Sequence, residues 1–136
     1  METKTTKISL LWVVIMVGFA AHILADVLPI FWGASVAMPE ATGEVQTGMV
    51  IFMMCIAFFI PACGLLCMQY RNCKTMRVIN LMLAAIMMLF NFFHMSELFT
   101  EFNPVQLFIL PVMAVVSVYL FIFSLRLMKN KSDHDA

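Results

Sequence analysis

Apolar residues fill four long stretches of the chain, and short polar segments separate them. The stretches cover residues 8–32, 47–69, 76–95 and 104–128. Each holds roughly 20 mostly apolar residues, which is the length a helix needs to cross a hydrocarbon core about 30 Å thick. Backbone polar groups find no water in lipid, so each stretch is expected to be helical. The pattern predicts an all-α, polytopic membrane protein whose four transmembrane helices form an up-down bundle.

One transmembrane domain is expected at residues 8–128, between a cytoplasmic N-terminus at 1–7 and a polar cytoplasmic tail at 129–136, which we expect to be disordered. Composition agrees, because 63% of the 136 residues are hydrophobic and only 12% are charged, against about 25% charged in soluble domains. A chain this short cannot bury so much apolar surface, so its main partner is the lipid bilayer. The formal net charge is zero and no basic run exists, which excludes nucleic acid as a partner.

Basic residues set the expected orientation. All eight fall on one side of a four-pass topology: Lys4, Lys7, Arg71, Lys74, Arg77, Arg126, Lys129 and Lys131. The loops on the other side carry Glu40, Glu44 and Glu101 and no Lys or Arg. The positive-inside rule therefore places both termini in the cytoplasm, in a multi-pass protein of the cytoplasmic membrane. Trp12 and Trp32 lie near the two ends of the first predicted helix, as interfacial tryptophans do.

Prolines predict bends in three helices and the start of one. Those within the predicted spans are Pro29, Pro61 and Pro111, and each removes a helical hydrogen bond and clashes with the carbonyl four residues earlier. For Pro29 that carbonyl belongs to Ala25, beside Asp26. The last helix is expected to begin at Pro104, with Asn103 as its N-cap and Gln106 as its third residue.

Four ionisable side chains lie inside the spans or at their outer edge: His22, Asp26, His94 and Glu97. His22 and Asp26 share one helix face, and Asn91, His94 and Glu97 form a slanted stripe on another helix. Counting from the middle of each predicted helix at 1.5 Å per residue places His22 about 3 Å and His94 about 10 Å outward of the bilayer centre. If the first and third helices are close, these side chains converge on one outward-opening site, with Thr47 and Gln106 at its rim.

Energetics indicate that these groups do not face lipid. A charged Asp near the bilayer centre costs about 2.5–3.5 kcal/mol on insertion scales. Both helices end on the outer side, so Asp26 and Glu97 lie toward the negative ends of their helix dipoles. A positive partner is therefore expected, which is a protonated His22 or His94 or a bound cation. A proton on Asp26 is the alternative.

Short motifs give a family resemblance. They are Leu11-Trp12, Ala25-Asp26-Val27, Ile60-Pro61, and Arg77 with Asn80. With these residues the chain resembles a family of small bacterial four-helix integral membrane proteins to which no activity is assigned. The resemblance implies the four-helix fold, and it implies that Asp26, Arg77 and Asn80 are structural or site positions.

The favoured function is binding or transport of a cation, a proton or a small polar ligand by an outward-facing pocket. The predicted ligand-binding residues are His22, Asp26, Asn91, His94 and Glu97, and a metal ion would use the four ionisable ones. Four helices are few for a transport path, so a homo-oligomer is expected if the protein transports its ligand. An accessory membrane subunit without chemistry is one alternative, in which the polar cluster only fixes helix packing.

A haem-binding redox protein is the other alternative, with His22 and His94 as axial ligands. Their predicted depths differ, which strains coaxial ligation, and no cofactor motif is present. A conventional enzyme is least favoured, because no Ser or Cys lies at the outer site as a nucleophile and the chain has no phosphate-binding loop. The sequence assigns no cofactor.

Overall fold

The computed structural model describes residues 2–37, 42–70, 73–100 and 104–129, and the regular structure in these parts is helical. Its elements are α1 (Glu2–Val27), the 3₁₀ turn η1 (Leu28–Trp32), α2 (Thr47–Met54), the π-helical turn η2 (Cys55–Phe59), α3 (Ile60–Tyr70), α4 (Lys74–His94), α5 (Glu97–Thr100) and α6 (Gln106–Lys129). Four segments are long and apolar enough to cross a membrane: Lys4–Trp32, Thr47–Tyr70, Lys74–Phe99 and Gln106–Lys129. The prediction of an all-α chain with four such helices is confirmed.

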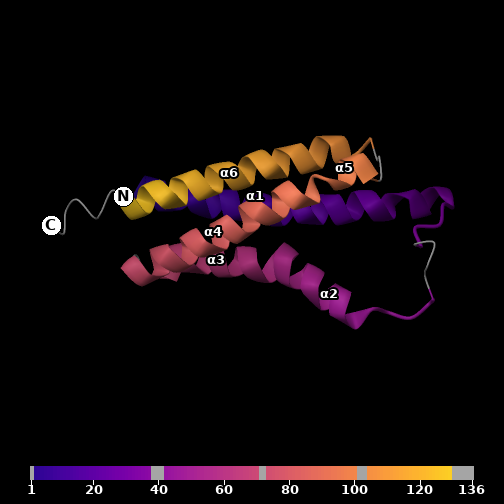
Figure 1. Cartoon of the computed structure of the whole chain (residues 1–136), viewed down its shortest axis with the longest axis horizontal. Helices are drawn as coiled ribbons and strands as arrows, with labels where there is room; N and C mark the ends of the chain where they lie inside the picture. The colour runs from indigo at the N-terminus through magenta and orange to yellow at the C-terminus, as the bar shows by residue number, and fades with distance from the viewer. Residues whose placement is uncertain (1, 38–41, 71–72, 101–103, 130–136) are drawn as a thin grey trace.

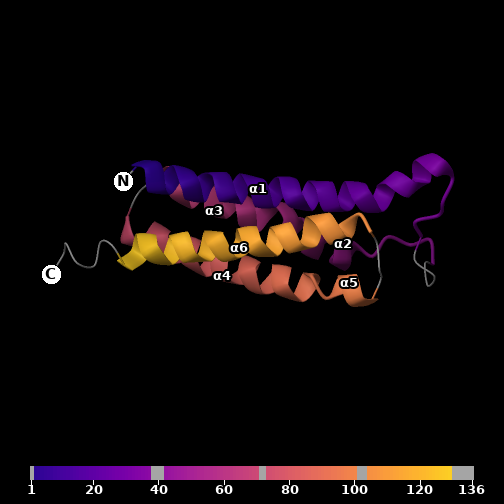
Figure 2. The same ribbon diagram turned by 90° about the horizontal axis from the view of Figure 1, so that it is seen from above.

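The long helices pack side by side (Figures 1 and 2). The main contacts join α1 to α3, α3 to α4, α4 to α6 and α6 back to α1. Each of these four helices therefore contacts two neighbours, and α1 and α4 lie diagonally across the bundle from each other. Figure 1 shows the start of α1 and the end of α6 at the same end of the molecule. Side chains from α1 and α4 therefore meet only where they reach through the interior.

The core lies along one stripe of α1, where buried residues recur every three or four positions. They are Ile8, Trp12, Ile15, Phe19, His22 and Ala25. This spacing keeps one face of a helix toward its neighbours. Met87 of α4 and Met113 of α6 are also buried and belong to the same core.

Trp12 does not face the surface, as an interfacial tryptophan does. Trp12 is fully buried, and its indole N–H donates to Asn80 Oδ1 at 2.8 Å. The Asn80 amide donates in turn to Ser124 Oγ at 2.8 Å. Gly64 leaves room for the ring, because a Cβ there would overlap the indole. An internal acceptor thus replaces the interfacial water that an indole N–H otherwise needs.

The three prolines have different effects on their helices. α1 ends just before Pro29, and the chain continues as η1 until Gly33 turns it with a φ of 77°. The π-helical turn η2 precedes Pro61, and α2 leans away from the other helices beyond it (Figure 1). All residues of α2 are exposed. Pro111 lies within α6 without ending the helix.

The predicted start of the last helix is also corrected. Pro104 and Val105 form a turn, in which the Phe108 N–H donates to the Val105 carbonyl, and α6 begins at Gln106. The Gln106 side chain is buried against α1, and those contacts place the first helical turn. The predicted cap Asn103 lies outside the described residues.

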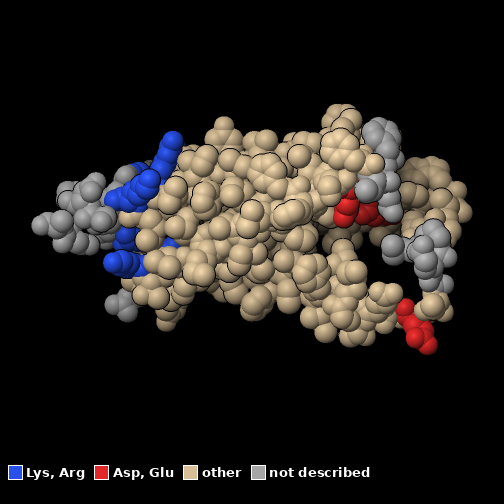
Figure 3. Space-filling model, viewed as in Figure 1, with Lys and Arg blue, Asp and Glu red and all other residues tan. Residues whose placement is uncertain are grey.

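Charge separates along the molecule (Figure 3). The described Lys and Arg side chains gather at the end where α1 begins, and the visible acidic side chains lie toward the opposite end. Several charged residues that entered the orientation argument lie outside the described parts: Glu40, Arg71, Glu101 and Lys131.

Candidate functional site

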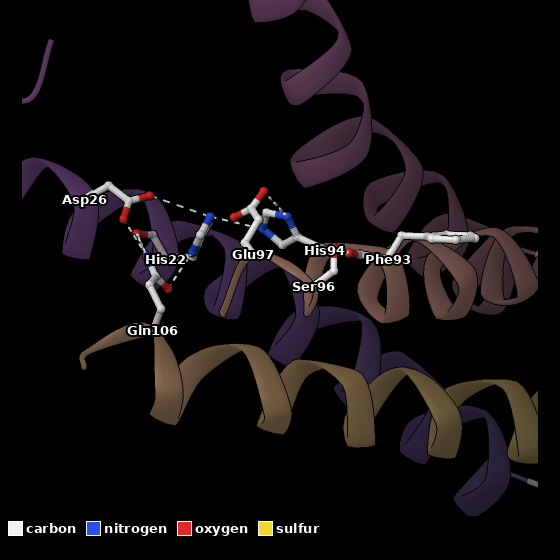
Figure 4. A network of polar contacts seen from close by, with 7 residues as sticks. All are labelled: His22, Asp26, Phe93, His94, Ser96, Glu97 and Gln106. Carbon is white, nitrogen blue, oxygen red and sulfur yellow. Dashed lines mark hydrogen bonds and ion pairs between the residues drawn. The ribbon is translucent and has the colours of Figure 1, made fainter. Parts of the chain in front are cut away.

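Two histidines from opposite corners of the bundle meet at the acidic end (Figure 4). His22 Nε2 of α1 lies 3.1 Å from His94 Nε2 of α4. Their ring centroids are 4.6 Å apart, and the ring planes are nearly perpendicular at 82°. The predicted difference in depth does not keep the two rings apart. α4 runs obliquely to α1 in Figure 1, so equal counts along the two helices do not give equal depths.

Gln106 is the centre of the network and not part of its rim. Its Oε1 accepts a hydrogen bond from His22 Nδ1 at 2.6 Å. Its Nε2 donates to Asp26 Oδ1 at 2.5 Å and to the His22 backbone carbonyl at 3.4 Å. One buried amide on α6 thereby holds both His22 and Asp26 of α1. The sequence signal for this role was the position of Gln106 at the outer start of the last span.

Glu97 completes the other side of the histidine pair. Its Oε1 lies 2.9 Å from His94 Nδ1. α4 ends at His94, and Ser96 Oγ donates to the Phe93 carbonyl at 2.6 Å within the turn that follows. That turn starts the short helix α5 at Glu97. Glu97 thus lies just beyond the C-terminal, negative end of α4, as expected, and it is also the first residue of α5.

Asp26 extends the cluster from the His22 side. Its Oδ2 lies 3.6 Å from His22 Nε2, one helical turn away. The Gln106 side chain brings the N-terminal end of α6 to Asp26. The positive end of that helix dipole acts against the unfavourable dipole that α1 imposes on Asp26. Sequence reasoning considered the dipole of α1 alone and missed this contribution.

The hydrogen-bond pattern leaves one place for a positive species. The His22 Nδ1 faces an amide oxygen and the His94 Nδ1 faces a carboxylate, so both Nδ1 atoms are donors. If both rings are neutral and protonated on Nδ1, the two unprotonated Nε2 atoms lie 3.1 Å apart and their lone pairs repel. A shared proton or a bound cation between the two nitrogens removes that repulsion.

Burial differs sharply within the cluster. The side chains of His22 and His94 are 7% and 11% exposed, whereas those of Asp26 and Glu97 are 50% and 53% exposed. The imidazoles are therefore the buried members of the cluster, and the two carboxylates are its half-exposed members.

Two other predicted positions do not join the network. Asn91 is buried one turn before His94, but its amide donates back to the Met87 carbonyl at 2.9 Å. Its Oδ1 is buried and has no hydrogen-bond partner among the described residues. Thr47 is exposed at the start of α2. Four of the five predicted ligand-binding residues are therefore brought together. The fifth, Asn91, bonds to the backbone of its own helix.

Aromatic rings close the inner side of the site. The Phe90 ring stacks on His94 with centroids 5.3 Å apart, and Phe19 lies 6.5 Å from His94. Phe19 also contacts Phe90 at 5.9 Å. Sequence reasoning missed these residues, although Phe90 precedes His94 by four positions on one helix face.

Three side chains have the geometry for a metal ion. His22, His94 and Glu97 each offer a ligand atom, and these atoms lie within 4.8 Å of one another. Asp26 was expected as a fourth ligand and lies beside His22, outside that group of three.

Comparisons of the chain with protein-family models, curated proteins and solved structures found no match, so the family resemblance stays a prediction.

Proposed function

We propose that this chain is a multi-pass protein of the cytoplasmic membrane that binds a cation at its outer face. Four apolar helices support the membrane assignment. An up-down arrangement with both termini in the cytoplasm fits the basic end of the molecule, where α1 begins and α6 ends (Figure 3). The histidine cluster lies toward the other end, so in this orientation its carboxylates open outward.

The observation that carries the proposal is the meeting of His22 and His94 at 3.1 Å between two carboxylates. Two imidazoles and a carboxylate are typical ligands for zinc and related divalent ions. Two nitrogens on a tetrahedral zinc ion lie about 3.3 Å apart when each Zn–N bond is about 2.0–2.1 Å. The apo distance between the two Nε2 atoms is already close to that value, so little rearrangement of α1 and α4 is needed.

Charge supports a divalent ion over a monovalent one. With both imidazoles neutral, Asp26 and Glu97 give the cluster two negative charges. A divalent cation cancels both, which matters most where the surrounding medium has a low dielectric constant. Gln106 already holds the His22 ring through Nδ1, as outer hydrogen-bond partners do around bound metals.

Binding fits the structure better than transport through a single chain. Inward of the cluster lie Phe19 and Phe90, followed by buried apolar side chains such as Ile15 and Met87. These four side chains offer a cation no oxygen or nitrogen ligand. Transport, and the homo-oligomer it would require, therefore stay predictions.

The test measures thermal unfolding of the purified full chain in detergent with ZnCl₂, MgCl₂ or NaCl, across a pH series. We expect Zn²⁺ to raise the Tm, by the mass action of a ligand that binds only the folded state. His94→Gln and Glu97→Gln should lose that rise. His134→Gln, which removes the third histidine of the chain, should keep it and serves as the matched control.

Cobalt gives a second measurement that does not depend on stability. Co²⁺ bound by histidine and carboxylate in a tetrahedral site absorbs visible light strongly, and His94→Gln should abolish the bands. If no cation and no change of pH stabilises the wild-type chain while every cluster substitution lowers its Tm, the accessory-subunit alternative replaces the proposal.

The haem alternative is disfavoured by geometry. A porphyrin between His22 and His94 would have to separate the two Nε2 atoms and, over the width of the macrocycle, α1 from α4. A Soret band in the purified protein that disappears in His22→Ala would reverse this assessment.

A further inference from the structure

A second polar feature lies at the basic end of the molecule, away from the histidine cluster. Between α1 and α6 a cavity of about 250 Å³ is lined by Lys4, Lys7, Phe123 and Arg126. Three of these four side chains are cations, and all three are exposed. Such a lining favours an anionic group of several atoms, and the open aromatic side favours one attached to an apolar body.

An apolar cavity of about 210 Å³ lies farther along the same two helices. Among its lining residues are Val14, Gly18 and Ala21 from α1, and Ile109, Val112 and Val116 from α6. The helices approach closely here, because Gly18 has no side chain where Met113 packs. The cavity is therefore a shallow groove on the outside of the helix pair.

The residues that line the two cavities follow one face of α1 and one face of α6. On α1 the lining positions 4, 7, 14, 18 and 21 fall on one face if position 11 is included, since each step is three or four residues. On α6 the positions 109, 112, 116, 123 and 126 do the same through position 119. Leu11 is partly buried, and the Tyr119 ring lies 6.1 Å from that of Phe123. The basic cavity and the apolar cavity therefore lie in line on one face of the α1–α6 pair, with Leu11 and Tyr119 between them, and we call this face the α1–α6 groove.

We propose that this α1–α6 groove binds an anionic phospholipid of the cytoplasmic leaflet. The phosphate lies among Lys4, Lys7 and Arg126, and one acyl chain follows the groove past Val14 toward Gly18. The lengths agree, because half of a hydrocarbon core is about 15 Å and eleven helical residues from Lys7 to Gly18 rise about 16 Å. Charge selects the headgroup, and the adjoining apolar groove selects a lipid over a free phosphate.

This lipid site is independent of the cation site, because the two share no residue and lie toward opposite ends of the molecule. Juxtamembrane cations attract anionic headgroups generally. The proposal differs in one respect: the basic residues of the groove bind the lipid headgroup, and other basic residues at the same end of the molecule do not. Lys74 and Lys129 supply the comparison, since they are exposed basic residues that do not line the cavity.

The experiment is native mass spectrometry of the purified full chain, released from micelles that contain equal amounts of phosphatidylglycerol and phosphatidylcholine. We expect one phosphatidylglycerol retained in preference to phosphatidylcholine. Lys7→Gln with Arg126→Gln should lower that preference by about 25-fold, at about fivefold for each cation removed. Lys74→Gln with Lys129→Gln, the matched control with the same change of net charge, should leave the preference unchanged.

A groove-filling variant tests the apolar half. Val112→Trp should weaken retention of phosphatidylglycerol, whereas competition by glycerol phosphate, which lacks acyl chains, should be weak in every variant. Equal retention of the two lipids by the wild-type chain overturns the proposal, as does an equal loss in the control variant. Displacement of the lipid by inorganic phosphate at comparable concentration would assign the basic cavity to a free anion.

Discussion

At the scale of single residues, Gln106 is the group on which the site depends. It satisfies His22 Nδ1 and Asp26 at the same time, from a third helix. Gln106→Leu leaves the buried His22 N–H without a partner, which costs about 1–3 kcal/mol. We expect a clearly lower Tm in detergent and a weaker response to Zn²⁺.

Gln69→Leu is the control for this substitution, because Gln69 donates to Ser9 Oγ at 3.2 Å in a half-buried contact elsewhere. It should lower the Tm less and keep the response to Zn²⁺. Equal effects of the two substitutions would show that the amide of Gln106 contributes only general packing.

Substitution of Asn91 should have the opposite effect to substitution of Gln106. Its Oδ1 is buried and has no partner in the part of the chain that the structure describes, so the native side chain already carries an unfavourable desolvation cost. Asn91→Leu removes that acceptor at similar volume, at the loss of one bond to the Met87 carbonyl. We expect an unchanged or higher Tm and an intact response to Zn²⁺. If Asn91→Leu abolished the rise of the Tm with Zn²⁺, Asn91 would be part of the binding site after all.

At the scale of elements, the contact of α1 with α3 rests on a missing side chain. A Cβ at Gly64 would overlap the indole of Trp12, and the indole is held in place by Asn80. Gly64→Ala must therefore separate the two helices or break that hydrogen bond. Overpacking of this kind costs about 1–3 kcal/mol.

Thermal unfolding and tryptophan fluorescence check this prediction, in a Trp32→Phe background that leaves Trp12 as the sole tryptophan. We expect a lower Tm and a red-shifted emission as Trp12 becomes accessible. Gly48→Ala is the control, because nothing lies near a Cβ there. Unchanged emission in Gly64→Ala would mean that the helices adjust without moving the ring.

The helices themselves were predictable from length and apolarity, because lipid leaves the backbone few choices. The structure differs from the sequence-based prediction at places where a single side-chain contact sets the local conformation. Trp12 looked interfacial because its internal acceptor, Asn80, lies 68 residues away. The start of α6 was misplaced because Gln106 contacts α1, and the end of α4 at His94 depends on a local turn. Contacts between distant residues leave no periodic signal.

At the scale of the whole molecule, sequence identified the members of the cluster but not its geometry. The i, i+4 spacing of His22 and Asp26 and the stripe ending at Glu97 were sufficient to nominate them. Their convergence required that α1 and α4 face each other across the bundle and that α4 run obliquely. Neither fact follows from hydropathy, which gives the length of a helix but not its neighbours.

The orientation of the chain in the membrane decides which compartment the histidine cluster and the α1–α6 groove face. Single cysteines at Glu44→Cys and Lys129→Cys, in a chain whose four cysteines are replaced by alanine, report opposite ends. Both positions are exposed. A membrane-impermeant maleimide applied to intact cells should label position 44 and spare position 129 until the cells are permeabilised, because the basic end stays in the cytoplasm.

The opposite labelling pattern would change the interpretation of the whole molecule. The histidine cluster would then face the cytoplasm and sample its metal pool, and the α1–α6 groove would meet the outer leaflet. Labelling of both positions in intact cells would mean that the chain inserts in two orientations. Because the described Lys and Arg residues lie at the start of α1, the start of α4 and the end of α6, we expect a single orientation, with the cation site outside and the lipid groove inside.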